Sequence, residues 1–220
     1  IVFPMAGLSR RFTEKGYDVP KYMLPLWDGF VFDFAVSSFQ GEFQQQPFLF
    51  IYRETGGVKD FLEARVEALG ITDARFAALE QPTAGQAETV ELGLKIAGVP
   101  DHTPLAIFNI DTFRKPESSP FPLSDQLDGW LEVFRGEGSN WSFVKPSQTE
   151  DGIAEETAEK VAISDLCSTG FYYFSSASIF YRALAKERET PSAPELYIEP
   201  IYNHLMAEGG RVGYGMVAPS

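Results

Sequence analysis

Residues Phe3 to Leu26 read FPMAGLSRRFTEKGYDVPKYMLPL, and this stretch determines how the start of the chain folds. An apolar strand over Ile1 to Met5 runs into Gly7, and four cations follow within twelve positions, namely Arg10, Arg11, Lys15 and Lys21. The whole chain has only 18 Lys and Arg against 31 Asp and Glu, so this local excess of positive charge needs a reason. We expect a small polyanion, held at the end of the strand by backbone N–H groups and a few cations.

The rest of the first half alternates strand-like and helix-like segments. The run PFLFIY at residues 47–52 is continuously apolar, which is typical of a strand covered on both faces. Apolar side chains at helical spacing predict helices over 58–69 and 85–97, and further strands are predicted at 74–79 and 105–110. This β-α-β-α-β order predicts a parallel sheet with right-handed crossovers.

The second half differs, because its first strands follow one another without helices between them. It contains predicted strands at 130–134, 141–144, 170–174 and 211–217, an extended excursion at 153–163, and helices at 178–187 and 195–208. We therefore expect a single domain over residues 1–220, of the α/β class, with three layers (α/β/α) and a mixed, mostly parallel sheet. A ligand should bind over the carboxyl ends of the parallel strands.

Composition excludes several classes of function. A formal net charge of −13 argues against nucleic acid as the main partner, because phosphate backbones need a basic face. The longest apolar runs have the length of strands, so we expect no membrane insertion. One cysteine, Cys167, and no visible signal peptide fit a reducing, cytoplasmic location. The oligomeric state stays open.

The loop after the first strand suits phosphate binding. Gly7 permits a close approach of the backbone to a ligand, and the planar guanidinium of Arg11 can grip phosphate oxygens. Lys21 follows Pro20 and supplies a compact charge on a stiffened segment. The alternative is a surface loop with scattered cations. The spacing matches neither the GxxxxGK phosphate loop nor the GxGxxG dinucleotide fingerprint.

Further segments carry a likeness to a known family. In order they are MAGLSRRF at 5–12, VPKYMLPL at 19–26, EQPTAGQAETV at 80–90, FNID at 108–111, AEKVAIS at 158–164 and STGFYYF at 168–174. With them the chain resembles the sugar-phosphate nucleotidyltransferases with a glycosyltransferase-A-like fold, and the likeness covers nearly the whole chain. Residues 197–217 are similar to the closing helix and strand of members used in capsule and lipopolysaccharide biosynthesis.

The resemblance implies roles on the nucleotide side of the site. The implied nucleotide-binding residues are Ala6, Gly7, Leu8, Ser9, Gln81 and Gly85. The first four belong to the loop that wraps the triphosphate in the family, and the last two would meet the base. Arg11 and Lys21 would be catalytic: Arg11 would stabilise charge on the phosphates during transfer, and Lys21 would hold the α-phosphate region.

The resemblance also implies a metal and an acceptor subsite. Asp111 would bind Mg²⁺, the one cofactor expected. Glu159 and Lys160 would receive the sugar and its phosphate, and Gly170 would line the sugar pocket. The second metal carboxylate that is usual in the family is not placed before Ser220.

The implied reaction joins an NTP to a phosphorylated small molecule, such as a sugar 1-phosphate, with release of pyrophosphate. A phosphate oxygen of the acceptor attacks the α-phosphorus of the nucleotide. Because this nucleophile is already an anion, the task is to align two anions and neutralise charge. An Asp, an Arg and two Lys suit that task better than a histidine dyad. We accordingly expect structural roles for His204 and for a buried Cys167.

Two alternatives stay open. Ser9 and Arg10 stand where the family has Gly and Ser, which motivates a nucleotide-binding relative with little catalysis. The other is a glycosyltransferase that uses a ready-made nucleotide sugar. That class usually carries Asp-x-Asp at its metal, whereas Thr112 and Phe113 follow Asp111 here, which disfavours it.

Overall fold

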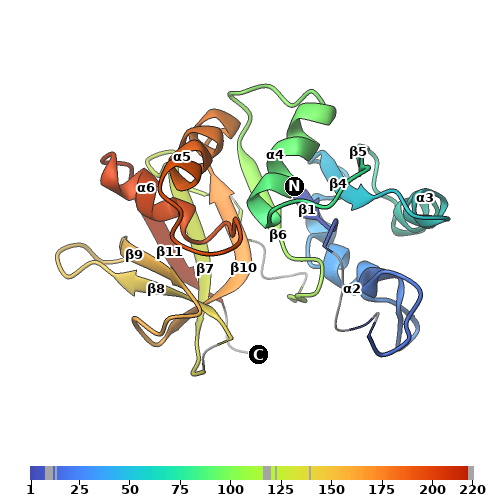
Figure 1. The fold of residues 1–220 in the computed structure, drawn as a ribbon, viewed down its shortest axis with the longest axis horizontal. Coiled ribbons are helices and arrows are strands. Elements are labelled where there is room, and N and C mark those ends of the chain that lie inside the picture. The colour runs from blue at the N-terminus through green and yellow to red at the C-terminus, as the bar shows by residue number, and fades with distance from the viewer. Residues whose placement is uncertain (8–11, 13, 116–119, 122, 139, 218–220) are drawn as a thin grey trace. The chain divides into compact units, whose positions relative to one another are not determined.

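The computed structural model describes residues 1–7, 12, 14–115, 120–121, 123–138 and 140–217. The chain folds as two compact units, and Figure 1 labels most of their helices and strands. The first unit comprises Ile1–Ala84, Glu88–Gly98 and Phe108–Ser119, and the second comprises Gly85–Ala87, Val99–Ile107 and Pro120–Ser220. The single domain expected over residues 1–220 stays a prediction.

Parallel strands form the sheet of the first unit, in the order β1 (Val2–Pro4), β4 (Phe48–Arg53) and β5 (Ala74–Leu79). Phe3 of β1 lies opposite Phe50 of β4, and their rings stack with centroids 5.6 Å apart. A row of aromatic rings therefore crosses the sheet and forms the core of this unit.

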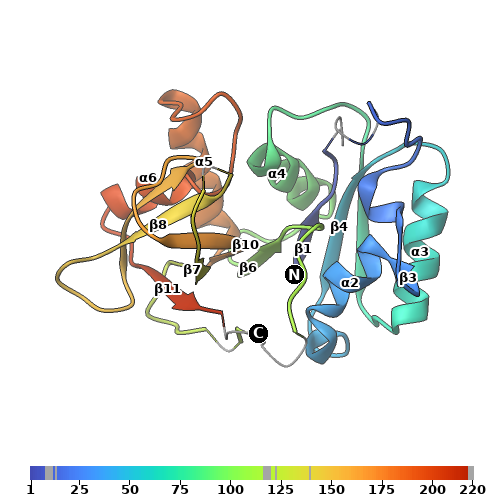
Figure 2. The same ribbon diagram turned by 90° about the horizontal axis from the view of Figure 1, so that it is seen from below.

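Helices cover both faces of this sheet. In Figure 2, α2 (Val31–Ser37) and α3 (Val58–Leu69) lie on one side of β1 and β4, and α4 (Gln86–Ile96) lies on the other. Phe32 of α2 contacts Phe50 of β4 with ring centroids 5.2 Å apart. Ile51, the next residue of β4, points to the opposite face, where it meets Gly93 of α4. The apolar run of β4 is thus covered on both sides, as its composition predicted.

The second unit has a mixed sheet. Strand β7 (Gly129–Arg135) pairs in parallel with β11 (Val212–Met216) and antiparallel with β10 (Leu166–Phe174). Strands β8 (Ser142–Pro146) and β9 (Ala154–Glu159) form an antiparallel hairpin, and β8 also pairs with β10. The predicted α/β fold class with a mixed sheet is confirmed.

Two helices pack on the sheet of the second unit. These are α5 (Ala177–Glu189) and α6 (Ile201–Ala207). Tyr202 of α6 stacks on Phe174 of β10 with ring centroids 4.5 Å apart, and Phe180 of α5 meets the same ring at 5.3 Å. Phe174 therefore holds both helices against β10.

The remaining described elements are short. They are η1 (Lys21–Met23), β2 (Pro25–Leu26), β3 (Gly29–Phe30), η2 (Gln40–Glu42) and β6 (Leu105–Phe108). Among the described helices, none combines the length and the apolar character that crossing a membrane requires.

The predicted elements occur in the observed order, but two of them begin elsewhere. The strand expected over 170–174 is longer than predicted, because β10 already begins at Leu166. The helix expected over 58–69 and the strand expected over 74–79 have the predicted bounds. The helix expected over 195–208 is wrong at its start, because α6 begins only at Ile201. Pro200 caps that helix, and the residue before a proline is held out of the helical region.

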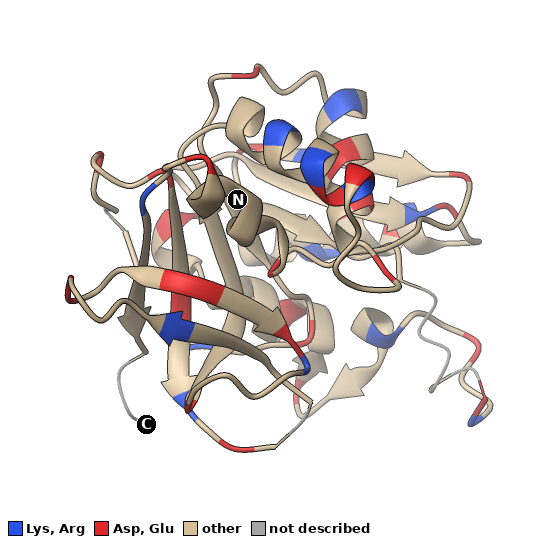
Figure 3. Cartoon of the chain, turned by 60° about the vertical axis from the view of Figure 1, so that its left-hand side comes forward, with Lys and Arg blue, Asp and Glu red and all other residues tan. Residues whose placement is uncertain are grey.

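Charged side chains of both signs lie close together on the surface. Figure 3 shows acidic and basic segments interspersed along the ribbon. On the β8–β9 hairpin, the Lys145 ammonium lies 2.7 Å from a carboxylate oxygen of Glu155 and 3.8 Å from one of Glu156. Glu155 and Glu156 are both exposed, so the acidic side chains of this hairpin lie in solvent.

The contact between α4 and β4 yields a prediction. A β-carbon at Gly93 would lie 2.2 Å from the Ile51 Cδ1. Gly93→Ala should therefore lower the free energy of unfolding by about 1–3 kcal/mol, the cost of overpacking, although Ala normally favours a helix over Gly. Urea denaturation measures this. In an Ile51→Ala background the cost of Gly93→Ala should vanish, and a stabilising Gly93→Ala in the native background would contradict the packing.

Candidate functional site

A direct ion pair joins two of the charged residues predicted for the phosphate side of the site. The Lys21 Nζ lies 2.6 Å from the Asp111 Oδ2, although 90 residues separate them in the chain. Both belong to the first unit, and both side chains reach solvent, with exposed fractions of 29% and 53%. The structure therefore brings a predicted catalytic lysine and a predicted metal ligand to one place.

Lys21 is held by the short helix η1 in which it lies. Pro20 precedes it in an extended conformation, and the Pro20 carbonyl accepts a hydrogen bond from the Met23 N–H at 2.9 Å. The next residue, Tyr22, is buried, and burial raises the pKa of its hydroxyl well above the ordinary value. Pro20 precedes Lys21 and the buried Tyr22 follows it, and together they fix the backbone from which the ammonium reaches out.

Asp111 is held by the strand that precedes it. Phe108 ends β6 and packs edge-on against Phe3 and Phe39, with ring centroids 6.1 and 5.1 Å apart. Ile110 is buried too, while Asp111 is exposed. The buried residues thus anchor the end of β6 and the turn after it, in which Asp111 lies.

Part of the predicted nucleotide loop lies outside the described residues. Leu8, Ser9 and Arg11 fall in the segment that is not described, so their roles stay predictions. Ala6 is buried and Gly7 is exposed at the end of the segment that follows β1. The Met5 N–H donates to the Ile51 carbonyl at 2.7 Å, which holds the start of this loop on β4.

The residues predicted to meet the base follow β5. Gln81 is exposed, and the turn after it is ordered by two contacts. The Ala84 N–H donates to the Glu88 carboxylate at 2.6 Å, and the hydroxyls of Thr83 and Thr89 lie 2.7 Å apart. This loop leads into α4.

Gly85 occupies a position where no side chain fits. A β-carbon there would lie 2.5 Å from the carbonyl oxygen of Leu196 and 2.6 Å from its nitrogen. Both residues belong to the second unit, so the close approach is internal to it. Gly85 is therefore required by packing, whatever it contributes to a ligand.

In the second unit, Glu159 and Lys160 form the predicted acceptor pair at the end of β9. The Lys160 Nζ lies 3.2 Å from the Glu159 Oε1 and donates to the Tyr197 hydroxyl at 2.9 Å. The same ammonium lies 4.5 Å from the centroid of the Tyr197 ring. These contacts, with Tyr197 first, raise the pKa of Lys160 and keep it charged. Lys160 also has a φ of +58°, which costs free energy in a non-glycine residue and marks a constrained site.

Gly170 lies in an irregularity of β10. The register with β7 shifts between Ser168 and Tyr172, and Gly170 has a φ of +86°. The Gly170 N–H donates to the Ser168 hydroxyl at 3.3 Å. Such bulges re-aim neighbouring side chains. The lining role predicted for Gly170 stays a prediction.

Glu199 is a buried carboxyl group that lacks satisfied hydrogen bonds. Its side chain is fully buried, and neither carboxyl oxygen has a hydrogen-bond partner of good geometry among the described residues. Burial raises its pKa to about 8; the Ser168 hydroxyl is near enough to oppose that shift, and the charge of Glu159 adds to it. Glu199 therefore carries a proton at pH 7, close to the predicted acceptor residues.

Asp111 suits a metal that the substrate helps to bind. Among the described residues, no three His, Cys, Asp or Glu side chains gather as a metal site. Mg²⁺ characteristically binds one or two carboxylates and completes its coordination with water and substrate phosphates. An exposed carboxylate beside a lysine fits that mode better than it fits a metal held by the protein alone.

Comparison with known proteins identifies the family. No protein-family model matches the chain, and no curated protein matches it either. Among solved structures, the nucleoside-diphosphate-sugar pyrophosphorylase from Vibrio cholerae RC9 is 41% identical, with a TM-score of 0.90. The match covers 99% of this chain and 91% of that one. The chain belongs to the nucleoside-diphosphate-sugar pyrophosphorylase family.

More distant structures share the fold of this pyrophosphorylase family. UDP-glucose pyrophosphorylase complexed with UDP-glucose has a TM-score of 0.76 at 17% identity, over 100% of this chain and 90% of that one. The inositol-1-phosphate CTP transferase from T. maritima has a TM-score of 0.76 at 15% identity, over 98% of this chain and 83% of that one. The resemblance to nucleotidyltransferases that the sequence motifs indicated is confirmed at the level of the family.

Two residues that no sequence motif indicated contact or approach the predicted acceptor residues, namely Tyr197 and Glu199. Both were placed inside a helix that actually begins at Ile201. The signal that could have found them is Pro200, because a proline in a helical pattern usually marks its first turn. Cys167 is buried as expected, and His204 contacts Glu187; the structural role expected for His204 stays a prediction.

The protonated state of Glu199 yields a prediction for stability. Its ordinary pKa is 4.5 and burial raises it to about 8, so between these values the unfolded chain loses a proton that the folded chain keeps. The free energy of unfolding should therefore fall as pH rises from 4.5 to 8. Glu199→Gln removes this pH dependence. As pH rises through this range, the free energy of unfolding of the variant should increase relative to that of wild type by on the order of 1.4 kcal/mol per pH unit. Urea denaturation at pH 5 and pH 8 measures it, and equal pH dependence in both proteins would contradict the assignment.

Proposed function

We propose that this protein transfers an NMP group from an NTP to a phosphorylated small molecule, such as a sugar 1-phosphate, and releases pyrophosphate. The observation that carries the proposal is the 41% identity to a nucleoside-diphosphate-sugar pyrophosphorylase over 99% of the chain. The pairing of Lys21 with Asp111 supports it, because it places a cation and a carboxylate together in the first unit.

The proposed chemistry is an in-line displacement at the α-phosphorus. A phosphate oxygen of the acceptor forms the new bond, and the bond from the α-phosphorus to its bridging oxygen breaks. The leaving pyrophosphate takes the electron pair, so no proton has to be removed from the nucleophile. Catalysis then requires alignment and charge neutralisation.

Lys21 and Asp111 have separate roles in this proposal. Bound Mg²⁺ would neutralise charge on the triphosphate, and Asp111 would hold it. Lys21 would turn its ammonium to the α-phosphate region. The ion pair between them then describes the ligand-free protein, and an exposed pair of this kind is worth only about 0–1 kcal/mol. Breaking this ion pair to bind a nucleotide and a metal therefore costs little free energy.

Glu159 and Lys160 would bind the acceptor. Lys160 stays charged and would hold the acceptor phosphate, while the Glu159 carboxylate would accept hydrogen bonds from hydroxyl groups. Arg11 would stabilise charge in the transition state, as the family motif implies. The closing segment, residues 197–217, supports a finer proposal that the product serves capsule or lipopolysaccharide synthesis in the cytoplasm.

Pyrophosphate release tests the function. Thermal-shift screening of CTP, UTP, dTTP, GTP and ATP with Mg²⁺ selects the nucleotide, because a tight ligand raises the melting temperature. The selected nucleotide is then incubated with a panel of sugar 1-phosphates. Release that depends on both substrates supports the proposal. Binding without release would favour a nucleotide-binding relative, and turnover of a nucleotide sugar would favour a glycosyltransferase.

The roles of Lys21 and Asp111 yield a further prediction. Lys21→Ala and Asp111→Ala should each lower kcat/KM by about 10²-fold or more, since each removes an interaction with developing charge. Only Asp111→Ala should raise the Mg²⁺ concentration needed for half-maximal rate. Asp151→Ala, which changes an exposed acid in the β8–β9 turn, is the matched control. Unchanged turnover in Asp111→Ala, with Mg²⁺ still required, would remove the metal assignment.

A further inference from the structure

A segment without helix or strand connects α5 to α6 in the second unit. We call residues 190–200 the strap. A chain of this length that lacks regular hydrogen bonding is costly to order, so its fixed path needs contacts that hold it. Three groups of contacts do so, at its start, its middle and its end.

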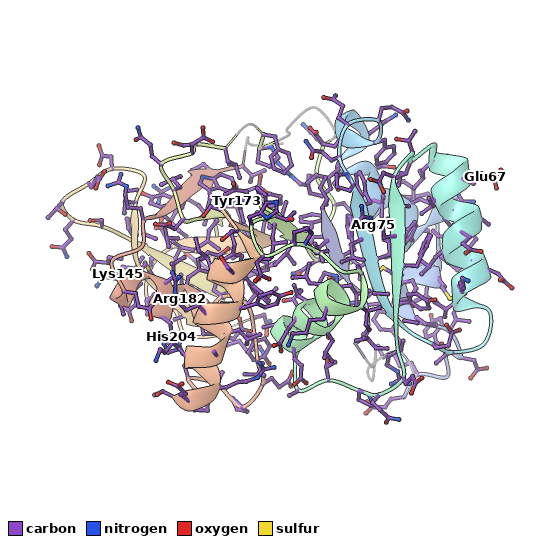
Figure 4. The ribbon with its side chains drawn as sticks, turned by 90° about the horizontal axis from the view of Figure 1, so that it is seen from above. Glu67, Arg75, Lys145, Tyr173, Arg182 and His204 are labelled. Carbon is purple, nitrogen blue, oxygen red and sulfur yellow. The ribbon has the colours of Figure 1, made fainter. Side chains whose placement is uncertain are left out.

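A buried carboxylate holds the start of the strap. Glu187 of α5 is 1% exposed, and its Oε1 accepts hydrogen bonds from both the N–H and the hydroxyl of Ser192, each at 2.7 Å. Its Oε2 lies 2.7 Å from the His204 Nε2 of α6, and Figure 4 labels this histidine beside α5. Each carboxyl oxygen of Glu187 thus has its own partner, Ser192 on one side and His204 on the other.

The backbone of the second unit holds the middle of the strap. The Ala87 N–H donates to the Leu196 carbonyl at 2.9 Å, and Gly85 leaves the space that Leu196 fills. Ala87 is in the first turn of α4, where N–H groups have no partner within the helix. The protection of this amide from solvent therefore depends on the strap.

The end of the strap reaches the predicted acceptor residues. Tyr197 accepts the hydrogen bond from Lys160, and the Thr157 hydroxyl donates to the Glu199 carbonyl at 2.7 Å. The strap thus begins at the buried Glu187, passes Gly85, which is predicted to meet the base, and ends beside Lys160, whose ammonium would bind the acceptor phosphate.

We propose that Glu187 and Ser192 are positioning residues for acceptor binding: they fix the strap, and the strap holds Tyr197 beside Lys160. This inference rests on the proposed function. A link between α5 and α6 alone would not require a buried carboxyl group, which is costly to desolvate. The Glu187 side chain instead directs one oxygen to His204 of α6 and the other to Ser192 of the strap.

Hydrogen exchange tests the anchor without any turnover. In Ser192→Ala, the amide of Ala87 should exchange at least tenfold faster than in the native protein, while amides of β10 keep their rates. Ser192→Thr keeps a hydroxyl and should restore slow exchange. Unchanged exchange at Ala87 in Ser192→Ala would overturn the proposal, whatever the protein catalyses.

Steady-state kinetics test the consequence for the acceptor. Hydrogen bonds to charged groups are strong enough that losing one should raise the acceptor KM about fivefold or more in Ser192→Ala. The kcat and the KM for the NTP should stay within about twofold, and Ser192→Thr should return the acceptor KM to its native value. Ser178→Ala, which removes an exposed serine hydroxyl at the other end of α5, is the matched control and should change none of these.

The outcomes separate the two proposals. Faster exchange at Ala87 with an unchanged acceptor KM would leave the anchor purely structural and overturn its positioning role. Equal rises in the KM of both substrates would also overturn it, because the strap would then not act on the acceptor. A native protein that binds an NTP but releases no pyrophosphate contradicts the proposed function, and in that case the acceptor role of the strap falls with it.

Discussion

The packing of Phe3 is the constraint on which the first unit depends. Its ring stacks on Phe50 of the neighbouring strand and meets Phe108 edge-on, so the ends of β1, β4 and β6 are set by one aromatic cluster. Close packing leaves little freedom to shift one strand without the others. The loop that carries Lys21 follows β1, and Asp111 follows β6. Their ion pair is therefore a consequence of the core beneath it, since the pair itself contributes little stability.

The second unit manages buried acids in two ways. Glu187 receives donors on both carboxylate oxygens, which compensates the cost of burying its charge. Glu199 lacks such donors among the described residues, and it avoids the same cost by holding its proton. One acid thus stabilises a fixed connection, whereas the other leaves a polar group unsatisfied beside Glu159. Unsatisfied groups of this kind are uncommon in cores and concentrate at functional sites.

Local signals explain why most elements could be predicted from the sequence. The helix over 58–69 has apolar residues at helical spacing between two glycines, and both glycines take the left-handed conformation at its ends. The start of α6 was predicted wrongly because the apolar spacing of residues 195–200 resembles a helix. There, the proline at 200 and the contacts of the strap outweigh that local preference.

The sequence by itself determined the fold class, the family and the candidate residues, because periodicity and short motifs are local properties that survive without coordinates. It could place Lys21 at a loop and Asp111 at a strand end, but it could not show that the two touch. That contact, the environment of Glu199 and the path of the strap were decided only by the tertiary structure. The physical reason is that burial and charge pairing depend on residues distant in the chain, brought together when the strands pair and the core closes.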